Sequence, residues 1–199
     1  TEIYTTAKSS AASDVYKRQG HSRMSGTLTL ALAGNPNAGK TSIFNALTGS
    51  NQHVGNWPGK TVSKMEGTFR RRDIVGRVVD LPGTYSLSAF SPEEVIARDY
   101  LLTREADAVL NVVDATNLER NLYLTSQLLE LGTPLILALN VMDSAKSQGL
   151  RIDNERLSAL LGGAPVVETV GHRGRGMDEL IDAAIGLVGT DKALMRLVA

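Results

Sequence analysis

The feature that most constrains the fold is the run Gly34-Asn35-Pro36-Asn37-Ala38-Gly39-Lys40-Thr41. It follows an apolar run, Leu28 to Ala33, and opens an amphipathic segment, Thr41 to Leu47. The run matches the pattern G-x-x-x-x-G-K-[ST] at every fixed position, between a predicted strand and a predicted helix. Glycines let successive backbone N–H groups point inward, so a loop at a helix N-terminus can bind phosphate oxygens. The run therefore predicts a nucleotide-phosphate site, with Lys40 near the β- and γ-phosphates and the Thr41 hydroxyl on Mg²⁺.

From Thr27 the chain alternates between strand patterns and helix patterns. Predicted strands cover residues 28–33, 61–69, 74–80, 108–113, 134–139 and 165–167, and predicted helices cover residues 40–48, 91–102, 116–131, 153–161 and 177–188. Residues 49–60 are predicted as a long loop and residues 70–73 as a hairpin turn. This alternation favours an α/β fold with a mainly parallel central sheet, one antiparallel edge hairpin and flanking helices. In such a sheet ligands bind outside the carboxyl ends of the strands, where the phosphate loop lies.

Length and composition bound the domain organisation and the partners. At 199 residues the chain is long enough for one well-packed domain. We expect residues 1–25 to be a disordered leader, residues 26–188 to form the domain, and residues 189–199 to be a truncated, helix-prone tail. Lys and Arg number 21, as do Asp and Glu, so the charge balance offers no sign of a nucleic-acid partner. No apolar run approaches the roughly 18 residues of a membrane-spanning helix, and we expect the segment to be soluble.

A second motif, Asp80-Leu81-Pro82-Gly83, has the form D-x-x-G and ends the predicted strand 74–80. The carboxylate of Asp80 can hold a water bound to Mg²⁺, while the N–H of Gly83 can reach the γ-phosphate of a nucleotide. By itself the motif is a common turn. Because it lies one hairpin after a phosphate loop, it indicates a segment whose position depends on the γ-phosphate.

A third motif, Asn140-Val141-Met142-Asp143, has the form N-x-x-D and follows the predicted strand 134–139. A carboxylate accepts hydrogen bonds from N1–H and the N2 amino group of guanine, whereas adenine offers no such pair of donors. Asp143 is therefore predicted to select guanine, with Asn140 tying the base edge to the phosphate loop. A charged hydrogen bond of this type contributes on the order of 1.5–3 kcal/mol, roughly tenfold or more in affinity. The alternative, a helix N-cap, would be preferred in a chain without a phosphate loop.

Two further segments complete the predicted nucleotide site. Thr61, at the end of the long loop, is expected to meet Mg²⁺ and the γ-phosphate, so that the loop orders with GTP. A threonine that merely begins a strand is the alternative. Val170-Gly171-His172 follows the last predicted strand, where a backbone N–H would contact the guanine carbonyl. The neighbours that we also expect to line the nucleotide are Ser42, Gly59, Lys60, Val62 and Ser63.

Four segments together resemble one known family. They are the phosphate loop and the segments Val54–Val62, Val79–Leu87 and Asn111–Leu122. From about Thr27 to Leu187, the chain is similar to the cytoplasmic G domain of the bacterial ferrous-iron transporter FeoB. The resemblance implies a P-loop NTPase fold of the Ras-like G-domain type, GTP hydrolysis, and K⁺ as a second cation with Asn37 as a ligand.

The resemblance also implies a longer protein around this domain. Members of the family continue into a helical domain that slows GDP release and then into a polytopic membrane domain, and neither lies in this sequence. A place at the cytoplasmic face of the bacterial inner membrane follows from the resemblance, which also allows a homo-oligomer. Guanine nucleotide is the expected ligand, and no nucleic acid is expected as a partner.

The chain departs from the pattern of related GTPases at three places. Val141 replaces a lysine common in other guanine motifs, which suggests loose nucleotide binding, and Gly171-His172 replaces residues of the Ser/Thr type. Thr84 stands where many GTPases place the glutamine that orients the attacking water. Hydrolysis is therefore expected to be slow, on the order of 10⁻⁴ to 10⁻² s⁻¹, and to depend on Mg²⁺ and a second cation. The catalytic contacts are assigned to Lys40, Thr61, Gly83 and Asn37.

The leading interpretation is a GTP-driven switch that controls ferrous iron transport, in which residues 51–61 and 80–91 reorder with the γ-phosphate. A free-standing GTPase acting in ribosome assembly is the alternative, but it predicts a basic face that the neutral charge disfavours. A P-loop kinase or ATPase is disfavoured by Asp143. The histidines, which are His21, His53 and His172, are scattered and joined by no carboxylate cluster, so the sequence predicts no iron site.

Overall fold

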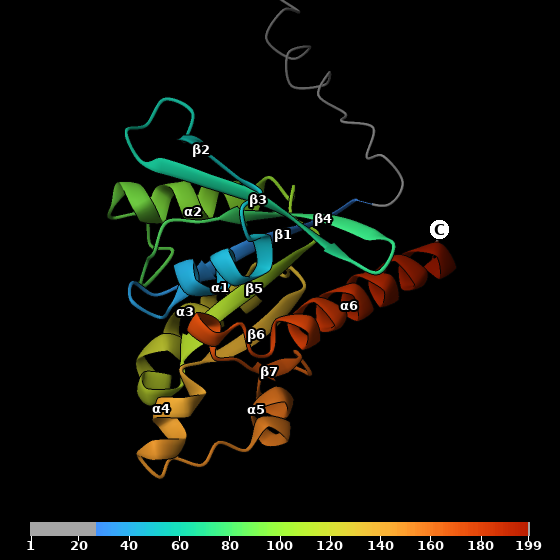
Figure 1. The fold of residues 1–199 in the computed structure, drawn as a ribbon. Helices are drawn as coiled ribbons and strands as arrows, with labels where there is room; N and C mark the ends of the chain where they lie inside the picture. The colour runs from blue at the N-terminus through green and yellow to red at the C-terminus, as the bar shows by residue number, and fades with distance from the viewer. Residues whose placement is uncertain (1–26, 199) are drawn as a thin grey trace, which may run out of the picture.

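A seven-stranded sheet forms the centre of the computed structural model, which describes residues 27–198, with side chains up to Gly189 (Figure 1). The strand order is β2-β3-β4-β1-β5-β6-β7. The strands are β1 (Thr27–Gly34), β2 (Gln52–Asn56), β3 (Ser63–Arg71), β4 (Ile74–Asp80), β5 (Ala108–Asp114), β6 (Leu135–Asn140) and β7 (Val166–Glu168). The predicted leader, residues 1–25, lies outside the described residues.

The strands pair in parallel except at one edge of the sheet. β1 lies between β4 and β5 and runs parallel to both, and β6 and β7 continue in the same direction. β3 is antiparallel to β4, and β2 is antiparallel to β3. The predicted fold class is confirmed: an α/β domain with a mainly parallel sheet and an antiparallel edge.

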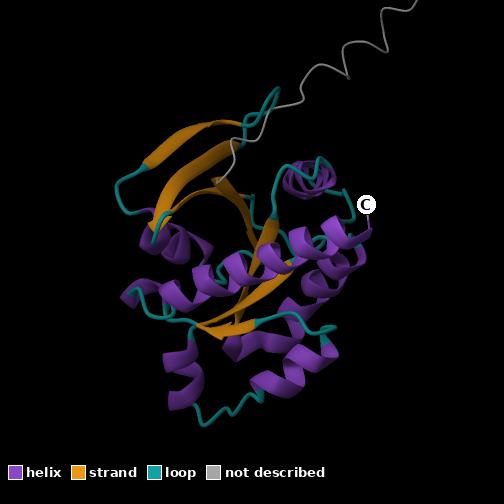
Figure 2. Cartoon of the chain, turned by 90° about the vertical axis from the view of Figure 1, so that its right-hand side faces the viewer, coloured by secondary structure: helices purple, strands orange, loops and turns teal. Residues whose placement is uncertain are grey.

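Helices pack on both faces of this sheet (Figure 2). They are α1 (Lys40–Thr48), α2 (Pro92–Leu102), α3 (Leu118–Glu130), α4 (Met142–Ser147), α5 (Asn154–Leu160) and α6 (Met177–Val198), with the 3₁₀ turns η1 (Ala115–Asn117) and η2 (Gly171–Arg173). Ile43 of α1 and Leu180 of α6 share one apolar core with the sheet. Ile96 of α2 and Leu124 of α3 share a second core. The sheet is therefore covered by two layers, which leaves its strand ends for function.

The two strands β5 and β6 carry the deepest part of the core. Every residue of β6 is buried, and so is every residue of β5 except Asp114. Burial on both faces explains why the sequences of these strands are nearly continuous apolar runs. Asn111, a polar residue inside β5, donates from Nδ2 to the Thr125 hydroxyl at 2.6 Å. The polar residues at the ends of β5 and β6 therefore extend from the most deeply buried part of the sheet.

The antiparallel edge extends further than the sequence pattern predicts. Residues 49–60, predicted as a loop, contain β2. Residues 53–56 of β2 are all exposed, so the strand has no apolar alternation by which it could be recognised. β3 continues to Arg71, so the predicted turn 70–73 shortens to Arg72 and Asp73, and Arg72 takes a φ of 52°.

Two helices also differ from the prediction. α4 was missed because its six residues are too few to show a helical period. α6 was predicted to end at residue 188, but it continues to Val198, so the segment expected as a separate tail extends this helix.

Arg71, at the end of β3, binds α6. Its guanidinium donates to Asp182 from Nε at 3.1 Å and from Nη2 at 2.7 Å, and its Nη1 lies 2.7 Å from Asp178. The hydrogen bonds from Arg71 lower the pKa of the Asp182 carboxyl. The ion pairs tie the edge hairpin to the last helix.

We expect Arg71→Ala to lower the midpoint of urea denaturation at pH 7 more than Arg70→Ala does. The Arg70 side chain is exposed and has no hydrogen bond or ion pair with residues 27–189, whose side chains the structure describes, so it is a matched control. Because folding lowers the pKa of Asp182, the pair stabilises the fold above the ordinary value of 3.8. The difference between the variants should therefore shrink as the pH falls below that value. Equal midpoints at pH 7 would contradict the assignment.

Candidate functional site

The polar motifs meet at the carboxyl ends of the central strands. Across β1 and β4, Leu32 lies opposite Asp80, and across β1 and β5, Gly34 lies opposite Val112. Asn140 ends β6 opposite Asp114 of β5. The phosphate loop and the D-x-x-G and N-x-x-D motifs therefore share one edge of the sheet, where ligands of such folds bind.

The phosphate loop, residues 34–41, turns tightly into α1. Gly39 is the N-cap of α1 and has a φ of 89°, in the left-handed region that favours glycine. A Cβ at Gly39 would lie 2.2 Å from Asn140 Nδ2, so the close approach of the two loops also requires glycine. The first N–H groups of α1 have no partner inside the helix and lie at its positive end. This end of α1 is therefore suited to an anion.

Lys40 and Asp80 form an ion pair within the site. Lys40 Nζ lies 3.1 Å from Asp80 Oδ1, and the two side chains are 10% and 13% exposed. Burial raises the pKa of the Asp80 carboxyl, while the charge and the hydrogen bond of Lys40 act in the opposite direction. Each charge compensates the other, so either residue can leave the pair only by gaining another opposite charge.

Asn140 joins two loops through one buried side chain, which is 3% exposed. Its Nδ2 donates to the Ala38 carbonyl at 3.0 Å. Its Oδ1 accepts from the Thr169 hydroxyl at 3.2 Å and from the Gly171 N–H at 3.0 Å. Asn140 thus contacts the phosphate loop, as predicted. Thr169 was not predicted, and the only signal for it was a polar residue directly before the predicted segment 170–172.

Asp143 lies in the first turn of α4 with a carboxylate that is 27% exposed. The N-cap of α4 is Val141, which has a φ of 62°, so the alternative role of Asp143 as an N-cap is not what the structure shows. Asp143 Oδ1 accepts from the Ser144 N–H at 3.0 Å. His172 Nε2 lies 3.6 Å from Asp143 Oδ2, so the structure brings together the two segments predicted to contact guanine.

Thr61 is not joined to the phosphate loop. It is exposed and makes no hydrogen bond to that loop in the described part of the chain. The surrounding segment closes on itself, because the Trp57 N–H donates to the Val62 carbonyl and the Lys60 N–H to the Trp57 carbonyl, both at 3.0 Å. The Trp57 ring packs edge-on against Tyr100 of α2, with centroids 5.4 Å apart. The segment that carries Thr61 therefore rests on α2.

The segment after Asp80 packs against the phosphate loop. The Thr84 N–H donates to the Gly34 carbonyl at 3.3 Å. A Cβ at Gly83 would lie 3.3 Å from Pro36 Cα, so the two loops approach closely there as well. Thr84 is 5% exposed, and its hydroxyl donates to the Ser86 carbonyl. Thr84, which occupies the position of glutamine in many GTPases, thus forms its side-chain hydrogen bond within its own segment.

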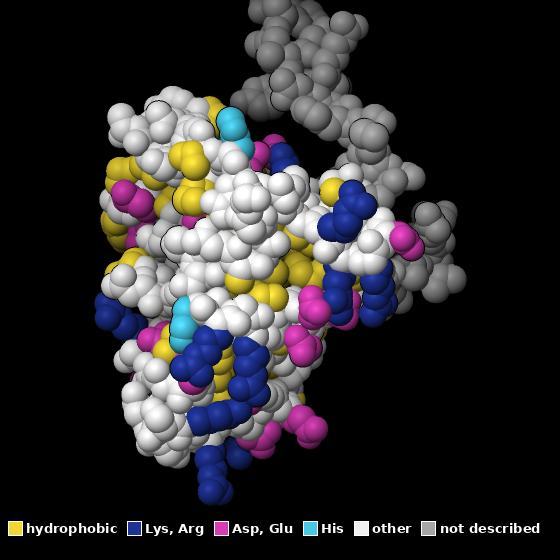
Figure 3. Space-filling model, viewed as in Figure 1, with side chains coloured by type: hydrophobic (Ala, Val, Ile, Leu, Met, Phe, Trp, Pro, Cys, Tyr) yellow, Lys and Arg dark blue, Asp and Glu magenta, His cyan; other side chains and the backbone are white. Residues whose placement is uncertain are grey.

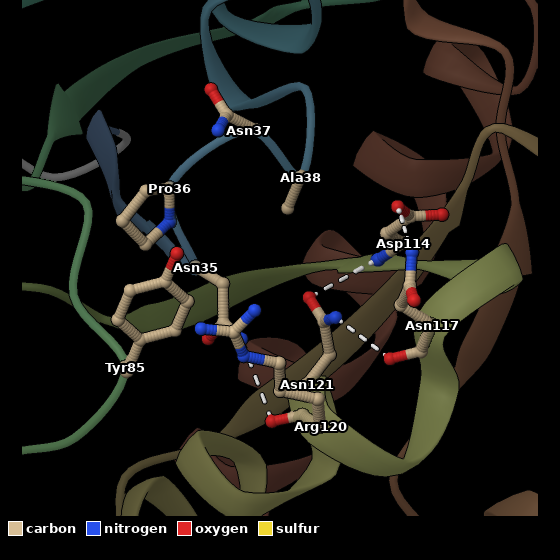
Figure 4. Close-up of a pocket in the computed structure, with 9 residues that line it drawn as sticks. All are labelled: Asn35, Pro36, Asn37, Ala38, Tyr85, Asp114, Asn117, Arg120 and Asn121. Atoms are coloured by element: carbon tan, nitrogen blue, oxygen red, sulfur yellow. Dashed lines mark hydrogen bonds between the residues drawn. The ribbon is translucent and has the colours of Figure 1, made fainter.

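A polar pocket of about 220 Å³ opens beside the phosphate loop (Figure 4). Its lining residues are Asn35, Pro36, Asn37, Ala38, Tyr85, Asp114, Asn117, Arg120 and Asn121. The Arg120 guanidinium lies 4.2 Å from the centre of the Tyr85 ring. Residues 114–121 belong to a segment that carried the family resemblance, but no role at this site was predicted for them.

The edge also offers oxygen ligands that suit Mg²⁺. The Thr41 hydroxyl lies in the first turn of α1, and the Asp80 carboxylate ends β4. Mg²⁺ prefers hard oxygen ligands and usually combines one or two protein groups with phosphates and water. Among residues 27–198, no group of three or more His, Cys, Asp or Glu side chains could hold a metal ion. The two oxygen donors therefore fit a cation that is shared with a phosphate ligand.

We expect Asn140→Ala to lower the free energy of unfolding by about 2–4 kcal/mol, because it leaves the buried groups of Ala38, Thr169 and Gly171 without their partner. Asn140→Asp should not restore stability, since it places a carboxylate oxygen against the Ala38 carbonyl. Asn45→Ala, at an exposed position of α1, is the control and should change the free energy by less than about 0.5 kcal/mol. Equal losses for Asn140→Ala and Asn45→Ala in urea titrations would refute the role of this side chain.

Known proteins share this sequence over most of the domain. Residues 28–184 match the family model of ferrous iron transport protein B. The Fe(2+) transporter FeoB of Escherichia coli (strain K12) is 56% identical over 157 residues, which are 77% of this chain and 20% of that protein. The Fe(2+) transporter FeoB of Salmonella typhimurium has the same identity and coverage. The chain thus spans about a fifth of the length of the curated relatives that it matches.

Solved structures share the fold. An S. thermophilus NFeoB mutant bound to GDP is 52% identical, with a TM-score of 0.77 over 82% of this chain and 64% of that chain. The G domain of the T. maritima FeoB iron transporter is 47% identical, with a TM-score of 0.75 over 81% of this chain and 98% of that chain. These matches confirm the resemblance predicted from the sequence, together with the Ras-like G-domain fold. The chain belongs to the ferrous iron transport protein B family, in which it corresponds to the N-terminal G domain.

Proposed function

We propose that this chain binds guanine nucleotides and hydrolyses GTP, as the switch domain of a ferrous iron transporter. The observation that carries the proposal is the Asn140 side chain, which bonds to the phosphate loop and to Gly171 while Asp143 lies beside residue 172. A base held between Asp143 and Gly171 would place its phosphates over the loop. The GDP bound by the related S. thermophilus NFeoB mutant supports the choice of nucleotide.

In this proposal Lys40 and Asp80 exchange partners when the nucleotide binds. Lys40 would leave the carboxylate, now 3.1 Å away, for the β- and γ-phosphates. Asp80 would turn to a water on Mg²⁺, with the Thr41 hydroxyl as a direct ligand. When bound, Mg²⁺ supplies positive charge that offsets the charge developing on the transferred phosphoryl group. Neither protein charge is left buried and uncompensated during the exchange.

The two switch segments would respond to the γ-phosphate. Thr61 and Gly83 would contact it, so that residues 51–61 and 80–91 reorder when it is bound or lost. Because the Thr84 hydroxyl is engaged with Ser86, no side chain at that position orients water as glutamine does elsewhere. We therefore propose slow turnover, on the order of 10⁻⁴ to 10⁻² s⁻¹.

The role of the whole protein is proposed from the relatives, which are named as Fe(2+) transporters and of which the chain spans about a fifth. In this proposal the domain acts at the cytoplasmic face of the bacterial inner membrane, attached to helical and membrane domains. Between residues 27 and 198, no helix is long and apolar enough to cross a membrane. The alternative of a free-standing GTPase in ribosome assembly is not favoured, because the family match is to iron transporters.

Titration calorimetry with GDP and ADP tests the nucleotide assignment. We expect GDP to bind more tightly than ADP, and Asp143→Ala to weaken GDP binding by about tenfold or more while ADP binding is unchanged, because only guanine uses the carboxylate. Asp153→Ala removes a carboxylate that caps α5 and should leave both affinities unchanged. If the unaltered chain binds GDP and ADP equally, the proposed selectivity of Asp143 is wrong.

Turnover in K⁺ and Na⁺ buffers tests the second cation, which we propose to be K⁺ held by Asn37. Asn37 lies in the phosphate loop with a φ of 68° and lines the polar pocket. We expect GTP hydrolysis to be faster in K⁺ than in Na⁺ by roughly tenfold, and Asn37→Ala to abolish that difference. Asn45→Ala should preserve the difference. Equal rates of the unaltered chain in the two buffers would contradict the proposal that K⁺ takes part in hydrolysis.

A further inference from the structure

Two side chains of the chain itself, an imidazole and a guanidinium, lie beside the carboxylate of Asp143. His172 Nε2 lies 3.6 Å and Arg173 Nη2 lies 3.8 Å from the same oxygen, Oδ2. The other oxygen, Oδ1, accepts from the Ser144 N–H at 3.0 Å. Both oxygens therefore have partners from the chain, although the carboxylate is open enough to receive a base.

The backbone fixes His172 and Arg173 beside Asp143. The Gly171 N–H donates to Asn140 Oδ1 at 3.0 Å, and a Cβ at Gly171 would lie 2.9 Å from Ile43 Cγ1, so this segment packs closely on α1. Val170 and Arg175 exchange two backbone hydrogen bonds, of 3.0 and 3.2 Å, on either side of η2. The segment that carries the two cationic side chains is thus anchored at both ends.

Two other charged groups nearby pair with each other. Lys146 Nζ, on α4, lies 2.7 Å from Glu168 Oε2. The hydrogen bond from Lys146 is the main cause that lowers the pKa of Glu168, and the charges of Lys146 and Arg175 lower this pKa further. In Figure 3, Lys and Arg side chains gather with a histidine on this part of the surface, near α4 and the start of α6. The residues that pair with Asp143 are His172 and Arg173.

We propose that His172 and Arg173 compete with the guanine base for Asp143, and that they thereby set the affinity for guanine nucleotides. The inference rests on the proposed function. Guanine presents two N–H donors to the two oxygens of a carboxylate, so it must displace or weaken the contacts to both side chains. Adenine makes no such demand on Asp143. The two side chains therefore lower the affinity for guanine selectively, and they reduce the preference for guanine over adenine.

Calorimetric titration of the chain with GDP and with ADP tests the inference. We expect the double variant His172→Gln/Arg173→Gln to bind GDP roughly threefold to tenfold more tightly, with ADP binding unchanged. Lys146→Gln is the matched control, because it removes a nearby charge that pairs with Glu168 instead of Asp143, and it should bind GDP like the unaltered chain.

The outcomes separate the inference from the function on which it rests. If the unaltered chain binds GDP and the double variant binds it equally or more weakly, the two side chains do not compete, and the inference is wrong. If Lys146→Gln gives the same gain, the effect is general electrostatics, and the contact to Asp143 is not its cause. If the unaltered chain binds no GDP, the proposed function is wrong, and so is the inference that rests on it.

Discussion

One buried amide, the side chain of Asn140, holds the functional edge of this molecule together. Its hydrogen bonds reach the phosphate loop at Ala38 and the last loop at Thr169 and Gly171. Because the amide is buried, its partners would be unsatisfied without it. Gly39 approaches it so closely that a larger residue would not fit. The loops that would grip the phosphates and the base are therefore positioned by one side chain, which couples the fold to the site.

The buried ion pair of Lys40 and Asp80 is the second constraint. A site for a polyphosphate and Mg²⁺ must concentrate charge in a region that folding removes from water, which is costly unless each charge is paired. Here the lysine, at the start of α1, and the carboxylate, at the end of β4, pair with each other. At the base end of the site, the more exposed carboxylate of Asp143 lies beside His172 and Arg173.

The sequence alone predicted the parts of the site that belong to motifs with a specific chemical role. The phosphate loop, Asp80 and Asn140 lie where their motifs predicted, because strand ends of a parallel sheet converge whatever the details of the helices. β2 was missed because its exposed residues show no apolar period. Its pairing with β3 is made by the backbone and leaves no pattern in the side chains. The contact of Arg71 with Asp182 and the closure of residues 57–62 on α2 depend on tertiary packing, which no local pattern encodes.

The central claim is that residues 51–61 and 80–91 are switch segments that sense the γ-phosphate from this edge of the sheet. Hydrogen–deuterium exchange of the chain, with GDP and with a non-hydrolysable GTP analogue in the presence of Mg²⁺, tests it most directly. The account predicts slower amide exchange in both segments with the GTP analogue than with GDP, while β5 and β6 exchange equally slowly in both states. Identical exchange of the two segments with the two nucleotides, each confirmed to be bound, would contradict it.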